Sequence, residues 1–131
     1  MAVFVTRIFN RWATRQGLSS STLCKAVREM SDGLYEADLG SGLLKKRIAR
    51  QGQGKSGGFR TIVATNKGNR WIFIYGFAKN ERSNIDKDEE AALKQLSAHL
   101  LSMTPQAFSK AATAGELMEV DCDAQDKIEN T

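Results

Sequence analysis

The segment 70–78, RWIFIYGFA, constrains the fold of this chain most strongly, because it is apolar almost throughout. Successive side chains of a strand point to opposite faces of a sheet. One face of this strand would carry Trp71, Phe73, Tyr75 and Phe77, and the other Ile72, Ile74, Gly76 and Ala78. A strand with two apolar faces is usually central in its sheet and covered on both sides. The segment therefore predicts a layered domain around a buried sheet.

The segments before this strand predict an antiparallel meander. FRTIVAT (59–65) is a second strong strand, joined to 70–78 by the hairpin signal NKGN (66–69). Residues 43–50 alternate, with Lys45 and Arg47 on one side and Lys46 on the other, and 34–39 predict a loosely paired edge element. The glycine-rich stretch 51–58 predicts a flexible loop.

A short strand at 3–8 and several helices surround the meander. Residues 9–16 predict one or two helical turns, and 20–30 predict an amphipathic helix. Asp86 and Glu89 predict a capping box at the start of the next helix, and Thr104-Pro105 opens a last one. The expected fold class is α+β, a small antiparallel sheet with helices packed on it. We expect one domain at 1–114 and a disordered acidic tail at 115–131.

The charge is unevenly distributed along the chain. The net charge is +4, but residues 115–131 carry −5 and the other residues +9. The segment 45–82 accounts for the whole excess, with ten basic residues against Glu81 alone. Such a concentration of positive charge is typical of proteins that bind a polyanion, most simply a nucleic acid.

Cysteine and histidine are scarce, which bears on cofactors and compartment. The N-terminus lacks the features of a signal peptide and no stretch is long and apolar enough to span a bilayer, so we expect a cytoplasmic protein. There, Cys24 and Cys122 are expected to be free thiols. His99 is the only histidine and no ligand cluster surrounds it, so we expect neither a metal nor another cofactor.

Two motifs carry a resemblance to a known family. GKSGGFRTIVA (54–64) and IYGFAKNERSNI (74–85) resemble the RelE-like toxins of toxin–antitoxin modules, most closely their phage-associated, HigB-like branch. The likeness extends from about Val3 to Met103. It implies a fold similar to the microbial ribonucleases, cleavage of mRNA in the ribosomal A site, and a cognate antitoxin, often a helix-turn-helix protein. The chain departs from RelE proper at Asn80, where RelE has a basic residue, and at Asp86, where it has a catalytic tyrosine.

Metal-free RNA cleavage needs a base for the 2′-hydroxyl, charge stabilisation at the phosphate and a proton for the leaving oxygen. Arg60 is our first candidate for a phosphate clamp, because the arginine fork suits phosphate geometry. Lys79 and Arg82 would assist at the phosphate or leaving oxygen, and Tyr75 is a possible proton carrier or stacking partner. The candidates for gripping the RNA backbone are Lys45, Arg47 and Lys55.

Each candidate also has a structural interpretation. Arg60 could be an ordinary strand arginine, and the Lys45–Arg47 run a solvated edge. Lys79 and Arg82 could form surface pairs with Glu81, Asp86 or Asp88. Tyr75, like Trp71 and Phe77, could belong to the core.

Two other functions compete with an mRNA endoribonuclease. A ParE-like toxin would share the fold and inhibit a protein such as gyrase, but it needs no cationic cluster. A DNA-binding regulator would concentrate basic residues on a recognition helix, which this chain does not. The acidic tail could screen the cationic face or contact the antitoxin.

Overall fold

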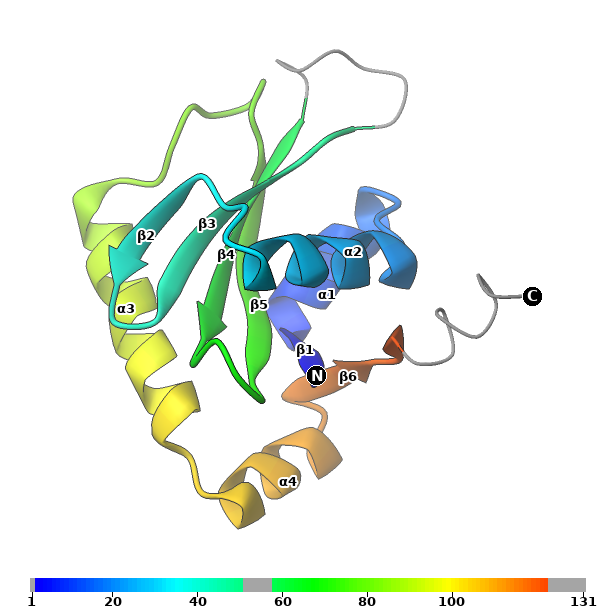
Figure 1. Cartoon of the computed structure of the whole chain (residues 1–131), viewed down its shortest axis with the longest axis vertical. Helices are drawn as coiled ribbons and strands as arrows, with labels where there is room; N and C mark the ends of the chain where they lie inside the picture. Colours follow the sequence, from blue (N-terminus) through cyan, green and yellow to red (C-terminus); the bar gives the residue numbers. More distant parts are fainter. Residues whose placement is uncertain (1, 51–57, 123–131) are drawn as a thin grey trace.

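A computed structural model describes residues 2–50 and 58–122 and shows four helices packed on a six-stranded sheet (Figure 1). The strand order is β2-β3-β4-β5-β1-β6. The strands are β1 (Val3–Thr6), β2 (Ala37–Gly40), β3 (Leu43–Ile48), β4 (Phe59–Thr65), β5 (Trp71–Ala78) and β6 (Leu117–Val120). The helices are α1 (Arg7–Arg15), α2 (Ser20–Ser31), α3 (Lys87–Ser102) and α4 (Pro105–Thr113). The α+β class is confirmed.

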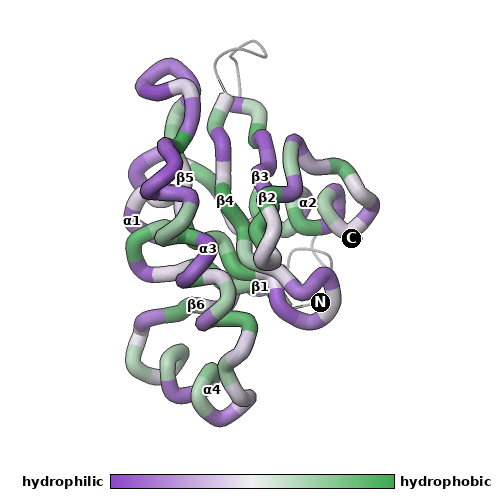
Figure 2. Tube along the Cα trace, turned by 90° about the vertical axis from the view of Figure 1, so that its left-hand side faces the viewer, coloured by the Kyte–Doolittle hydropathy of each residue, from purple (hydrophilic) through white to green (hydrophobic). Residues whose placement is uncertain are grey.

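The predicted meander is present as β2, β3, β4 and β5, each antiparallel to the next, and β5 is buried as expected. The sheet as a whole is mixed, because β1 pairs parallel to β5. The chain reaches β5 from β1 only after α1, α2 and three other strands, so the two can run in the same direction. Figure 2 shows that apolar residues gather along the strands in the middle of the molecule.

Two hydrophobic cores lie on opposite faces of the sheet. The first packs α1 and α2 against the sheet, with Phe9, Val27 and Phe73 fully buried. The second packs α3 and α4 on the other face, through Leu100 and Phe108. Every helix begins with a side-chain N-cap, and α3 has the predicted capping box between Asp86 and Glu89. The first strand is shorter than predicted because the hydroxyl of Thr6 caps α1.

The prediction of which sheet face each β5 side chain points to is wrong in the second half of the strand. Trp71 and Phe73 belong to the α1/α2 core, whereas Tyr75 and Phe77 lie on the α3 side together with Ile74. The cause is a β-bulge, since Ile62 pairs with Tyr75 and the next residue, Val63, pairs with Phe73. The extra residue reverses the alternation and turns Tyr75 to the other face.

The first part of the acidic tail is ordered, contrary to prediction. Residues 117–120 form β6, antiparallel to β1, and Leu117 is only 2% exposed. β6 supplies hydrogen-bond partners to the outer edge of β1 and buries an apolar side chain, and these gains outweigh the local negative charge. Residues 123–131 lie outside the described residues.

The expectation of two free thiols is also wrong, since Cys24 and Cys122 form a disulfide. Cys24 lies in α2 and Cys122 follows β6, so the pairing of β6 with β1 carries Cys122 to the α1/α2 core. Sequence spacing could not show this proximity. Among the described residues, no helix is long and apolar enough to cross a membrane.

Candidate functional site

The register of β3, β4 and β5 places the candidate residues in two rows. Arg47 lies opposite Arg60, which lies opposite Phe77. In the second row Lys45 lies opposite Ile62, which lies opposite Tyr75. Directly opposed residues point to the same face of a sheet. Because Phe77, Ile62 and Tyr75 belong to the α3-side core, the cationic side chains share that face.

Arg60 is held firmly in this face. It is only 9% exposed, and its Nε lies 2.7 Å from Oε2 of Glu36, in the segment leading into β2. Its Nη1 is the one buried side-chain nitrogen or oxygen of the described residues that has no hydrogen-bond partner. A shallow hollow lined by Leu34, Tyr35, Glu36, Lys46, Arg47 and Arg60 lies beside it. Arg60 therefore combines a guanidinium anchored by Glu36 with a second nitrogen that is buried and has no hydrogen-bond partner.

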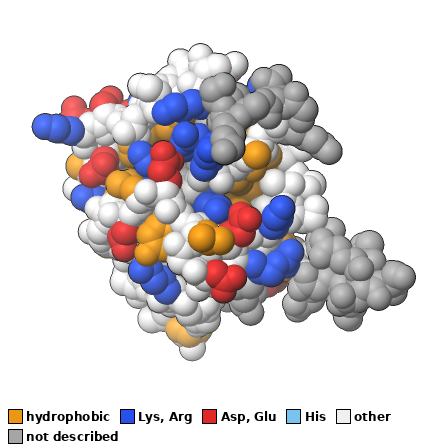
Figure 3. Space-filling model, turned by 45° about the horizontal axis from the view of Figure 1, so that its top comes forward, with side chains coloured by type: hydrophobic (Ala, Val, Ile, Leu, Met, Phe, Trp, Pro, Cys, Tyr) orange, Lys and Arg blue, Asp and Glu red, His pale blue; other side chains and the backbone are white. Residues whose placement is uncertain are grey.

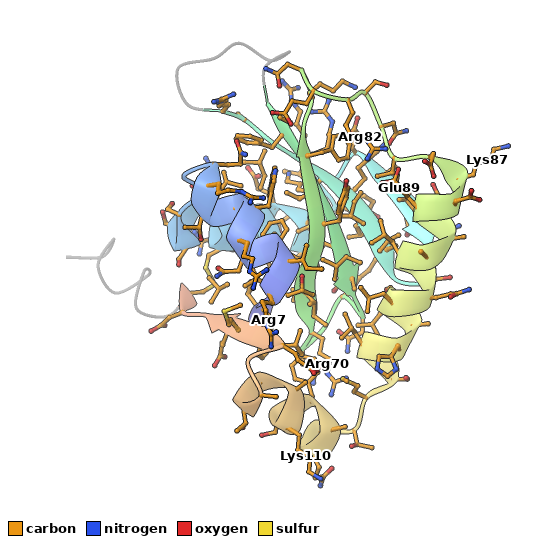
Figure 4. All side chains as sticks on the ribbon, turned by 180° about the vertical axis from the view of Figure 1, so that it is seen from behind. Arg7, Arg70, Arg82, Lys87, Glu89 and Lys110 are labelled. Atoms are coloured by element: carbon orange, nitrogen blue, oxygen red, sulfur yellow. A yellow bond between two sulfur atoms is a disulfide. The ribbon has the colours of Figure 1, made fainter. Side chains whose placement is uncertain are left out.

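Arg82 reaches the same face from the segment after β5. Its guanidinium carbon lies 5.6 Å from the ring centre of Phe77, the residue opposite Arg60. Its Nη1 donates to the Tyr75 hydroxyl at 3.1 Å, and Nη1 and Nη2 both donate to the carboxylate of Glu89. Figure 4 shows Arg82 and Glu89 close together at the start of α3. Arg82 thus links Tyr75 in β5 to Glu89 in α3.

This ion pair shifts the pKa of both side chains. The hydrogen bond from Arg82, followed by one from the backbone of Asp86, lowers the pKa of Glu89 to about 2. The hydrogen bond to Glu89 raises the pKa of Arg82 further above its ordinary value. Both groups therefore stay charged across the range in which proteins normally act.

Lys45 and Lys79 both bind residues that neighbour Arg82 in the chain. Lys45 Nζ lies 3.4 Å from the side-chain oxygen of Asn84, whose backbone carbonyl accepts from Nε of Arg82. Lys79, at the end of β5, donates from Nζ to the backbone oxygen of Ser83 at 3.1 Å. A lysine ammonium has three donors, so each retains hydrogens for a ligand.

The structure brings together most of the predicted site. Arg60, Tyr75, Arg82, Lys45 and Arg47 share one face, and Lys79 directly follows β5. Lys55 lies outside the described residues.

The remaining cations of 45–82 are scattered. Lys46 points to the α2 side, where it pairs with Glu29. Arg50 lies over the ring of Phe59, a residue of the α1/α2 core. Arg70 is structural, donating to the carbonyl of Leu100 near the end of α3 and lying over the Phe108 ring. Figure 3 shows basic and acidic side chains interspersed over the upper surface. Only part of the positive charge of residues 45–82 therefore lies on the sheet face that carries Arg60.

Sequence reasoning missed the carboxylates that hold the two arginines. Arg82 pairs with Glu89 and not with the candidates Glu81, Asp86 or Asp88. The sequence pattern indicates only the capping box for Glu89, but its carboxylate serves both roles. Nothing in the sequence points to Glu36, because its contact with Arg60 depends on how the chain enters β2. Among the described residues, no three His, Cys, Asp or Glu side chains form a group able to hold a metal ion.

Fold and site together define a small α+β protein with a cationic face on an antiparallel meander. Comparison with protein families matches residues 1–120 to the RelE toxin of the RelE/RelB toxin–antitoxin system. The chain belongs to this family and is a toxin-type component of such a system, which implies an antitoxin partner. The match reaches the end of β6. No curated protein matches the chain.

Proposed function

We propose that this toxin is an mRNA endoribonuclease that works without a metal or another cofactor and inhibits translation. The observation that carries the proposal is the arrangement of Arg60, Tyr75 and Arg82 on one face of β4 and β5. Family membership supports it. The cationic face favours an RNA substrate over a protein target such as gyrase, because a ParE-like inhibitor needs no phosphate-binding donors.

The proposed roles follow from the available donors. Arg60 contributes positive charge on this face to stabilise the developing charge on the scissile phosphate, and its buried Nη1 reaches the phosphate once neighbouring side chains move aside. Tyr75 offers its hydroxyl to a substrate oxygen, and Lys79 adds positive charge near the leaving oxygen. Lys45 and Arg47 hold the RNA backbone beside them, with Lys55 from the adjacent segment. Lysine, tyrosine and arginine here take the parts that histidine plays in other ribonucleases.

The proposed setting is the cytoplasm, with mRNA presented on the ribosome and activity controlled by a cognate antitoxin, often of the helix-turn-helix type. A small open face fits this setting, because the ribosome would supply much of the RNA positioning.

The decisive experiment maps the 5′ ends of a reporter mRNA translated by purified ribosomes in the presence of the full chain. We expect cuts in the translated frame that are lost with Arg60→Ala. Arg11→Ala is the matched control, because Arg11 is exposed on α1, on the opposite side of the sheet, and its loss should leave cleavage unchanged. Undiminished cleavage by folded Arg60→Ala protein would remove Arg60 from the site. Inhibition of gyrase supercoiling without RNA cleavage would support the ParE-like alternative.

A further inference from the structure

Glu89 performs two tasks in the first turn of α3. Its Oε1 accepts from the backbone N–H of Asp86 at 3.0 Å, while its own N–H donates to Asp86 Oδ1 at 2.8 Å. The same carboxylate accepts from Nη1 and Nη2 of Arg82. The reciprocal cap fixes the carboxylate relative to the helix, and the bidentate pair then fixes the plane of the guanidinium.

Arg82 has little capacity left for a substrate. A guanidinium carries five N–H groups, and four of them donate to Asn84 O, Tyr75 Oη and the two oxygens of Glu89. One N–H of Nη2 has no partner among the described residues. Arg82 is therefore poorly suited to bind a phosphate through two hydrogen bonds, unlike an arginine whose guanidinium has no other partners.

The bond from Arg82 determines what Tyr75 can do. A phenol has a single hydrogen, and here its oxygen is an acceptor from Nη1. The hydroxyl hydrogen must therefore point away from Arg82. The bulge in β5 has already turned Tyr75 to the face that carries Arg60 and Lys45. Tyr75 is thus a donor on the face proposed to bind the phosphodiester.

We infer that Glu89 is a positioning residue, which acts through Arg82 to hold Tyr75 as a hydrogen-bond donor to an oxygen of the scissile phosphodiester. This inference rests on the proposed function, since it assigns a role within that reaction. Glu89 itself touches no substrate. It acts through two hydrogen-bonded contacts. The first joins Glu89 in α3 to Arg82, and the second joins Arg82 to Tyr75 in β5.

Glu89→Gln isolates this role, because glutamine at the same position preserves the capping box but removes the charge that binds Arg82. We expect the single-turnover cleavage rate on programmed ribosomes to fall by up to about a hundredfold, the loss that a misplacement of about 1 Å can cause. RNA affinity should be unchanged or slightly higher, because a negative charge is lost. Glu90→Gln removes the same charge one residue later, where the partner is Lys94, and should cleave like the wild type.

A double-variant cycle distinguishes positioning from a structural role. Tyr75→Phe should lose at least as much rate as Glu89→Gln, and the double variant should be no slower than Tyr75→Phe alone, because both act through one hydroxyl. Independent, multiplicative losses would overturn the inference. So would wild-type cleavage by Glu89→Gln.

A second measurement stays informative even if the wild-type chain cleaves no RNA, a result that would refute the proposed function. Nuclear magnetic resonance can follow exchange with water of the Arg82 Nη–H hydrogens, which donate to Tyr75 and Glu89. We expect slow exchange in the wild type and in Glu90→Gln, and faster exchange in Glu89→Gln. Equal protection in all three would show that Glu89 does not position Arg82.

Discussion

The six-membered ring of the Trp12 indole lies against Gly76, so that α1 contacts the central strand directly. A Cβ at position 76 would overlap with Trp12 Cζ3 and would lie only 2.6 Å from Cε3. Trp12 is also held by Phe9 and Phe59, whose ring centres both lie 5.5 Å from its own. The ring therefore has little freedom to move aside.

Gly76→Ala should destabilise the protein by about 1–3 kcal/mol, the usual cost of forcing an extra methyl group into a packed core. Urea unfolding measures this directly. Gly68→Ala is the control, because its Cβ would meet only Asn66 Oδ1, at an ordinary 3.6 Å. If both variants unfold at the wild-type urea concentration, the close contact of α1 with β5 is incorrect.

Reducing the bond between Cys24 and Cys122 should lower stability strongly. The two residues are 98 positions apart, and a cross-link that closes so long a loop contributes about 4–5 kcal/mol on the chain-entropy model. Guanidinium unfolding with and without a thiol reductant tests this. The Cys24→Ser, Cys122→Ser double variant should unfold like the reduced protein and be indifferent to reductant. A wild-type protein equally indifferent to reductant would argue against the disulfide.

The Arg82–Glu89 pair should make stability depend on pH in the acid range. In the unfolded chain Glu89 takes up a proton near its ordinary pKa of 4.5, but in the folded protein its pKa is about 2. The unfolded state therefore binds more protons between these values, so stability is present above pH 4.5 and is lost as the pH falls towards 2.

Glu89→Gln should remove this part of the acid dependence and flatten the stability profile below pH 4.5. Asp38 also has a lowered pKa, because the backbone N–H of Gly40 donates to it, and it contributes equally to both proteins. The difference between the two profiles, measured by urea unfolding at a series of pH values, therefore reports Glu89 alone. Parallel profiles would show that the ion pair does not form in solution.

The sequence predicted those features that local patterns determine. The alternation of apolar residues located β4 and β5, the NKGN turn joined them, and Asp86 with Glu89 marked the start of α3. The family motifs led to Arg60 and Arg82, which share one face. These features depend on residues close together in the chain, so their signals are readable without a structure.

The remaining features depend on contacts between distant segments. The bulge opposite Ile62 reversed the facing of Tyr75 and Phe77, and strict alternation cannot anticipate such an inserted residue. β6 gains its stability only from the edge of β1, and the disulfide follows from that pairing. Glu36 lies just before β2, and Arg60 lies in β4. The two meet only because both strands pair with β3 in the folded sheet.

The position of β1 has a consequence for synthesis of the toxin. Of the six strands in the described residues this one is made first, yet its partners on either side are β5 and β6, the last two. Its hydrogen bonds to β6 must wait until residue 120 has been translated. A nascent chain therefore lacks the finished sheet until β6 has been synthesised.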